Sequence, residues 1–238
     1  MGRFVRASAA AIIALSATSL AAASVLVVRS SGPSSKVYPP GKALQDNQSI
    51  ALKSNDMLVL LDSRGTRTLK GPGAFSASAS AAASGSALSA VTAQNNNRRV
   101  RIQAVRGGPT GATQGRNVWQ ADLGRSGAVC VASPADLGLY RAAASREADV
   151  TLRDSGGKSA VVHFAPGQTI ASWPSALPVV SGAKYKVIGN GASPTVLEVR
   201  MISPVPAGLE GMAQSFIRND CQAQLDVLID TFTSPSSS

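Results

Sequence analysis

The fold class is decided by the stretch Met57-Leu58-Val59-Leu60-Leu61-Asp62-Ser63-Arg64-Gly65-Thr66-Arg67-Thr68-Leu69-Lys70. Its first five residues are a short apolar run, which predicts a buried strand. Asp62–Gly65 has the composition of a hairpin turn, and the threonine-containing run Thr66–Lys70 predicts the returning strand. The stretch therefore predicts an antiparallel hairpin within a mainly β unit.

The residues on either side continue this pattern of short strands and turns. Val25–Val28 and Ile50–Lys53 predict two further strands. Tyr38–Gly41 and Gly71–Gly73 predict turns, because proline removes a backbone donor and glycine permits sharp bends. Residues 24–75 show no helical pattern, so we expect them to form a small N-terminal β-domain.

Four segments of this region resemble a known family. They are Val25–Gly32, Gly41–Leu44, Leu58–Asp62 and Leu69–Gly73. In this order they resemble the FecR-type periplasmic β-domain, including its D-x-x-G turn at Asp62–Gly65, while Asn55 stands where that family commonly has glycine. The resemblance implies a β-rich module of envelope sensing or scaffold proteins, some of which regulate sigma-factor signalling. The family has no catalytic residue that the resemblance could assign to this chain. The remainder of the chain resembles bacterial exported proteins.

Residues 1–23 have the order of regions found in a secretory signal peptide. Arg3 and Arg6 precede the uncharged stretch Ala7–Val28, and Ala21–Ala23 places small side chains before Ser24. We therefore expect cleavage before Ser24 and a periplasmic or secreted protein. An uncleaved N-terminal membrane anchor is the alternative, because a helix of 22 residues can span a bilayer.

Cys130 and Cys221 are the two cysteines of the 238-residue chain and lie 91 positions apart. An oxidising compartment favours a disulfide between them. Two buried free thiols are the alternative. Because the sequence contains neither Cys-x-x-Cys nor His-x-x-x-His, we expect no metal site and no cofactor.

The middle of the chain combines a small-residue segment with a basic one. Residues 76–97 begin with a run of Ala, Ser and Gly, which predicts a linker, an alanine-rich helix being the alternative. Arg98 follows, and Arg99, Arg101 and Gln103 then alternate with Val100, Ile102 and Ala104, which predicts a strand with one basic face. Such a face attracts anionic envelope polymers. A solvated face that only serves solubility is the alternative.

The charge balance narrows the class of partner. Lys and Arg number 23 against 13 Asp and Glu, a formal net charge of +10. We expect no nucleic-acid partner, because of the export signal and because aromatic residues for base stacking are missing near the arginines. The expected partner is an anionic envelope component or another envelope protein, and peripheral membrane contact is compatible with both. The predicted contact residues are Arg98, Arg99 and Arg101, with Arg64, Arg67 and Lys70 as a second patch.

Residues 98–233 predict a β-sandwich followed by two helices. Seven short strands, with a hairpin turn at Asp154–Gly157, suggest an Ig-like antiparallel sandwich. Apolar stripes then predict helices around 209–217 and 221–232, with Asn219–Asp220 ending the first and capping the second. The predicted class is mainly β, α+β overall, with a disordered tail at 234–238. The predicted strands are Gly127–Ala132, Leu137–Arg141, Ala148–Arg153, Ser159–Phe164, Gln168–Trp173, Ala183–Ile188 and Thr195–Met201.

The sequence offers no catalytic constellation. His163 lies in an apolar strand and is expected to be structural on the solvent side. Gly156–Ser159 lacks the upstream glycine of a phosphate-binding loop. Trp173 and Tyr185 suit core packing better than sugar stacking. We therefore predict an exported, non-enzymatic binding, scaffold or sensory protein. The alternatives are a secreted hydrolase that uses Ser–Lys or paired carboxylates without His or metal, and a docking partner that binds another protein through its paired helices.

Overall fold

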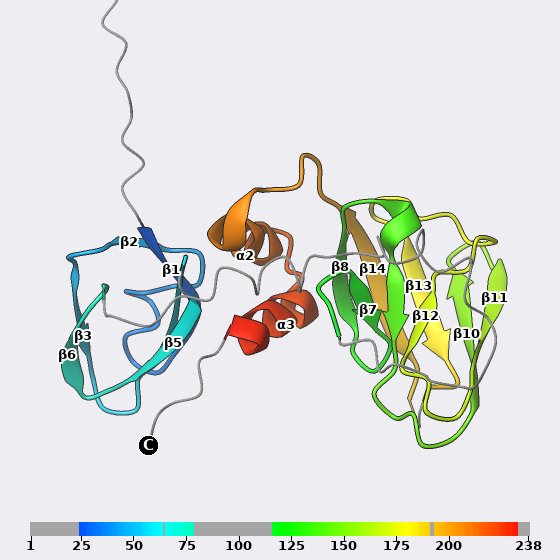
Figure 1. Cartoon of the computed structure of the whole chain (residues 1–238), viewed down its shortest axis with the longest axis horizontal. Helices are drawn as coiled ribbons and strands as arrows, with labels where there is room; N and C mark the ends of the chain where they lie inside the picture. The colour runs from blue at the N-terminus through cyan, green and yellow to red at the C-terminus, as the bar shows by residue number, and fades with distance from the viewer. Residues whose placement is uncertain (1–23, 64, 79–115, 191–192, 233–238) are drawn as a thin grey trace, which may run out of the picture.

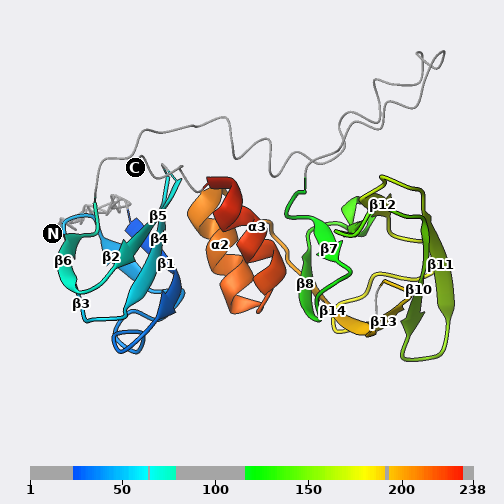
Figure 2. The same cartoon turned by 90° about the horizontal axis from the view of Figure 1, so that it is seen from below.

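The computed structural model describes residues 24–63, 65–78, 116–190 and 193–232. They form two β-units with a pair of α-helices between them (Figures 1 and 2). The predicted class, mainly β with two helices near the C-terminus, is confirmed. The predicted signal peptide, most of the linker, the arginine-rich strand and the tail lie outside the described residues.

The N-terminal unit combines a four-stranded antiparallel sheet, in the order β2-β1-β4-β5, with the two-stranded sheet β3-β6. The hairpin predicted from Met57–Lys70 is β4–β5, and Asp62 lies opposite Gly65 at its turn. Two short strands, β2 and β6, were not predicted. The strands are β1 (Ser24–Ser31), β2 (Ala43–Gln45), β3 (Ser49–Leu52), β4 (Met57–Asp62), β5 (Gly65–Lys70) and β6 (Gly73–Ser76).

Strands β1 and β4 are apolar along most of their length because both faces of their sheet are covered. Val27 and Leu60 pack into a cluster with β3 and the adjoining turns. Val28 and Leu61 pack on the opposite side, against the helices. A strand that is buried on both faces has no reason to alternate apolar and polar residues. Burial of both faces of these strands therefore explains the continuous apolar runs in the sequence.

Asp56 fixes the turn that joins β3 to β4. Its buried carboxylate accepts hydrogen bonds from the backbone amides of Ser34, at 2.8 Å, and Lys53, at 2.5 Å. Burial alone would raise the pKa of Asp56, but the hydrogen bonds from Ser34 and Lys53 outweigh it and the pKa is lowered. Asn55 has a φ of 66°, in the left-handed region that glycine favours and asparagine tolerates.

Replacing Asp56 by Asn is expected to lower the melting temperature at neutral pH, since the amide oxygen replaces only one of two anionic acceptors. A carboxyl group whose pKa is lowered by folding stabilises the fold above its unfolded pKa of about 3.9. That contribution is lost as the pH falls through the folded-state pKa. The melting-temperature difference from wild type should therefore shrink below about pH 4. Asp46→Asn is the control, and a difference that stays constant down to about pH 2.5 contradicts the assignment.

The C-terminal unit is a two-layer sandwich of a five-stranded sheet, β11-β10-β13-β14-β8, and a three-stranded sheet, β12-β9-β7. All seven predicted strands are present, and β7 is an addition. The strands are β7 (Gln120–Asp122), β8 (Gly127–Val131), β9 (Gly138–Tyr140), β10 (Ala148–Asp154), β11 (Ser159–Phe164), β12 (Ile170–Ser172), β13 (Lys184–Ile188) and β14 (Thr195–Met201); a short 3-10 helix, η2 (Pro134–Asp136), follows β8.

Two strand pairings correct the prediction of an antiparallel sandwich. β8 runs parallel to β14, and β7 runs parallel to β9. Each of these pairs joins strands that are not linked by a hairpin, so their relative direction depends on the path of the chain between them. The apolar pattern of a single strand contains no information about that path.

Aromatic side chains fill the sandwich core. Tyr185 is almost completely buried, and the ring of Trp173 lies edge-on to it with 4.9 Å between centroids. The Trp173 indole donates a hydrogen bond to the carbonyl of Leu177 at 2.9 Å. The two rings are thus packing residues, as predicted. His163 lies on the solvent side, also as predicted, and its Nδ1 is 2.8 Å from a carboxylate oxygen of Asp149.

The helices are α2 (Gly208–Arg218) and α3 (Gln222–Phe232), and both predicted apolar stripes face inward. The turn between them differs from the prediction. Asp220 has a φ of 57°, and the amide of Cys221 donates to the carbonyl of Phe216 at 2.9 Å. These features end α2 in a Schellman motif. The Asp220 carboxylate accepts a hydrogen bond from the side chain of Gln222, at 3.3 Å, rather than capping the backbone of α3.

Candidate functional site

The two helices lie between the β-units and contact both (Figure 2). One apolar cluster joins Leu26 of the first unit, Trp119 and Ile202 of the second, and Phe216 and Leu228 of the helices. We call α2 and α3, with the residues of both units that contact them, the joint. The apolar stripes of both helices are buried in the joint.

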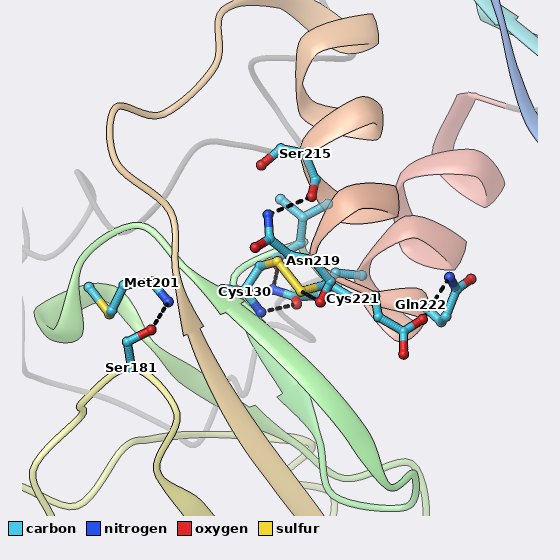
Figure 3. Close-up of a disulfide and its surroundings, with 10 residues drawn as sticks. Cys130, Ser181, Met201, Ser215, Asn219, Cys221 and Gln222 are labelled. Carbon is cyan, nitrogen blue, oxygen red and sulfur yellow. Dashed lines mark hydrogen bonds between the residues drawn. A yellow bond between two sulfur atoms is a disulfide. The ribbon is translucent and has the colours of Figure 1, made fainter. Parts of the chain in front are cut away.

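A disulfide anchors the joint to the sandwich (Figure 3). It links Cys130 on β8 to Cys221, the residue before α3, with 5.8 Å between Cα atoms. Both cysteines are fully buried. The predicted pairing is therefore confirmed, and it attaches the helical pair to an edge strand of the five-stranded sheet.

Gln224 makes a second attachment beside the disulfide. Its side-chain oxygen accepts a hydrogen bond from the amide of Cys130 at 2.6 Å. Its side-chain nitrogen donates to the carbonyls of Val118, at 2.6 Å, and Cys130, at 2.7 Å. The side chain is 1% exposed. Gln224 thus satisfies backbone groups on the outer edge of β8, which would otherwise be left unpaired inside the joint.

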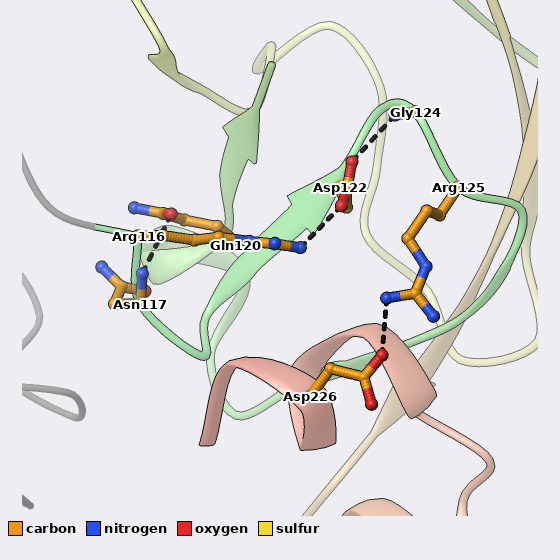
Figure 4. Close-up of polar contacts among 7 residues, drawn as sticks. All are labelled: Arg116, Asn117, Gln120, Asp122, Gly124, Arg125 and Asp226. Atoms are coloured by element: carbon orange, nitrogen blue, oxygen red, sulfur yellow. Dashed lines mark hydrogen bonds and ion pairs between the residues drawn. The ribbon is translucent and has the colours of Figure 1, made fainter. Parts of the chain in front are cut away.

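Asp226, one turn further along α3 than Gln222, links the two β-units through its two oxygens. One oxygen pairs with Arg29 of β1. The other pairs with Arg125 of the turn before β8, at 2.7 Å, as Figure 4 shows. The pairing of β1 with β4 shifts register between Val27 and Arg29, which marks a β-bulge. A bulge re-aims side chains, and here Arg29 reaches the same helix pair against which Val28 packs.

The charge of Asp226 is stabilised by this arrangement. Burial alone would raise the pKa of its carboxyl group. The hydrogen bonds and positive charges of Arg125 and Arg29 outweigh burial, so the pKa is lowered. The group therefore stays ionised through the neutral range and into mild acid.

A second polar cluster lies next to Arg125 on the sandwich side (Figure 4). The buried carboxylate of Asp122 accepts hydrogen bonds from Arg116, at 2.6 Å, and from the amide of Gly124, at 2.9 Å. The Arg116 guanidinium also lies 4.5 Å from the ring centre of Tyr140. These contacts pair every charge of the cluster, which suits it to fixing the turn after β7 rather than to chemistry on a substrate.

A cavity of about 120 Å³ separates this turn from the start of α3. Asp122, Arg125 and Asp220 are its charged lining residues. A cavity needs about 10–15 Å³ of such volume to hold one water molecule, so this one has room for several. Within the described ranges no three His, Cys, Asp or Glu side chains come together as a metal site.

The predicted contact residues are only partly described. Arg98, Arg99, Arg101 and Arg64 lie outside the described residues. Arg67 donates hydrogen bonds to the carbonyls of Ser76, at 2.7 Å, and Ala77, so its guanidinium holds the end of β6. Lys70 is exposed at the end of β5.

Sequence reasoning did not identify the polar residues of the joint. Gln224 and Asp226 adjoin the apolar stripe of α3, and nothing local distinguishes them from solvated helix positions. Their partners lie 94 to 197 positions away in the chain. Only a three-dimensional arrangement brings these groups together.

Comparison of the chain with protein-family models, curated proteins and solved structures finds no match. Neither described α-helix has the length and apolar character needed to cross a membrane.

Removing the disulfide tests its contribution to stability. Replacing both Cys130 and Cys221 by Ala is expected to lower the free energy of unfolding by about 4–5 kcal/mol, because the bridge closes a loop of 91 positions in the unfolded chain. Urea denaturation of the oxidised wild type and the double variant measures the difference. An unchanged midpoint and slope would show that the bridge adds nothing to the stability of the joint.

Replacing Asp226 by Asn tests the link across the helices. The variant leaves Arg29 and Arg125 without their shared carboxylate, and we expect a loss on the order of 1 kcal/mol near pH 7. Asp230→Asn is the matched control, since it makes the same change on an exposed position one turn further along α3. The loss should fall with rising salt, and it should vanish as the pH drops through the lowered pKa of Asp226. Equal losses in both variants would contradict the assignment.

Proposed function

We propose that the protein is an exported, non-enzymatic binding or scaffold protein of the cell envelope. The observation that carries this proposal is the joint, with its disulfide in the middle of an apolar core. Disulfides persist in oxidising compartments and are rare in the cytosol. The FecR-like pattern of residues 25–73 favours the same location and the same class of protein.

The joint also favours a scaffold over two independently moving domains. The helices bury apolar side chains from both units, and Asp226 adds ion pairs to each side. Domain interfaces that are large and apolar hold their partners in a fixed orientation. A fixed orientation presents two β-surfaces to partners at a constant spacing.

Two cavities lined by described residues are small for chemistry in a pocket and favour binding at a surface. Besides the cavity of about 120 Å³, one of about 260 Å³ lies between the end of α2 and the segment after β14. Its lining includes Arg218 and Asn219 but no carboxylate. Both volumes are below the range of about 300–1,000 Å³ that is common for small-molecule sites.

Cell fractionation tests the proposed location. The full chain is expressed in a Gram-negative host, and the expected product is a periplasmic protein that begins at Ser24. Thiol labelling under denaturing conditions should find both cysteines protected until a reductant is added. Recovery of the intact chain from the cytosol, with two reactive thiols, contradicts the proposal.

An activity screen tests the non-enzymatic assignment. The purified protein is assayed with ester, peptide and glycan substrates, and no turnover above a heat-denatured sample is expected. Reproducible turnover above that background would replace the binding proposal by the hydrolase alternative.

A further inference from the structure

The outer face of the five-stranded sheet carries a row of side chains that crosses four strands. Ser159 on β11 lies opposite Arg153 on β10. Arg153 lies opposite Lys186 on β13, and Lys186 lies opposite Val196 on β14. All four residues are exposed, on the face that points away from the sandwich core. We call these four residues the basic row.

The two cations at the centre of the basic row are not compensated within the described residues. Arg153 and Lys186 form no ion pair with any described carboxylate. Like charges in directly opposite cross-strand positions destabilise a sheet. An anion that binds between them would remove this repulsion.

Two strand carboxylates on the same face, Asp149 and Glu198, have partners of their own. Asp149 pairs with His163 at 2.8 Å. Glu198 lies 2.6 Å from Arg200 and 3.6 Å from Lys184. Glu198 is thus paired with two cations beside the basic row, whereas the contact of Asp149 with His163 is an ion pair only when the imidazole is protonated.

Apolar side chains flank these cations. Val161 is 63% exposed on the outer face of β11, and Val196, at the end of the basic row, is 42% exposed. A soluble polyanion has phosphate, sulfate or carboxylate groups for the cations but nothing apolar to cover the valines. The interfacial region of a bilayer offers both kinds of contact.

We propose that this face binds the surface of an anionic phospholipid bilayer. Arg153 and Lys186 contact lipid phosphates, while Val161 and Val196 pack into the apolar boundary beneath the headgroups. Strands β10 and β11 lie at the end of the molecule farthest from the helices (Figures 1 and 2), so this part of the face is remote from the N-terminal unit. The inference rests on the proposed envelope location, where such a surface is accessible.

Vesicle sedimentation tests this proposal with the chain from Ser24 onward, which contains every described residue. Wild type should bind vesicles of mixed phosphatidylglycerol and phosphatidylcholine, bind phosphatidylcholine alone much more weakly, and dissociate as salt rises. The variant Arg153→Glu/Lys186→Glu should bind the anionic vesicles at least about 30-fold more weakly, because each cation near the surface contributes about 1 kcal/mol. If this variant is not folded, Arg153→Gln/Lys186→Gln replaces it, with a loss of about 30-fold.

A matched control distinguishes the effect of charges on this face from the effect of the protein's net charge. Lys36→Glu/Lys53→Glu makes the same change in charge at two exposed positions of the N-terminal unit. It should bind within about threefold of wild type, because charges beyond a Debye length act weakly. Equal losses in both double variants, or a greater loss in the control, overturn the proposal. So does equal binding of wild type to neutral and anionic vesicles.

Substitution of the two valines distinguishes binding to a bilayer from binding to a soluble polyanion. Val161→Ser/Val196→Ser should weaken vesicle binding several-fold and leave binding to dextran sulfate unchanged. Unchanged vesicle binding in this variant overturns the proposed contact with the bilayer and favours a soluble polyanion as the partner. All of these measurements use purified protein, so their failure is distinct from a failure of the fractionation experiment, which tests location alone.

Discussion

The structure depends on a single requirement, that the second apolar face of the N-terminal sheet be covered. Leu26, Val28, Val59 and Leu61 form that face, and the sheet's other face is already packed. The helices that cover it come from the far end of the chain and also pack against the sandwich. Burial of apolar surface on two sides of one helical pair therefore makes two β-units into one body.

The attachments within this body are unequal. On the sandwich side the helices are held by the disulfide and by three hydrogen bonds of Gln224. On the side of the N-terminal unit they are held by apolar packing, by the ion pair of Arg29 with Asp226, and by the contact of Thr66 with the carbonyl of Ile229 at 3.4 Å. A disulfide thus fixes the helices to the sandwich, whereas only noncovalent contacts hold them against the N-terminal unit.

Much of the fold is local enough to be predicted from sequence. The hairpin at Met57–Lys70, the seven sandwich strands and both helices follow from apolar periodicity and turn residues. β7 was missed because Gln120-Ala121-Asp122 is short and two-thirds polar although fully buried. The parallel pairings, the role of Asp220 and the contacts of Asp226 depend on the chain's path. Arg153 and Lys186 likewise become neighbours only through the register of β10 and β13.

The position of the helices has a consequence for the order in which the protein is made. The N-terminal sheet is synthesised first, but one of its apolar faces stays uncovered until residues 208–232 follow. A ribosome adds about 5–20 residues per second, so this face remains open for many seconds. A chain that has not yet reached these residues therefore keeps an apolar face uncovered, and such a surface promotes aggregation.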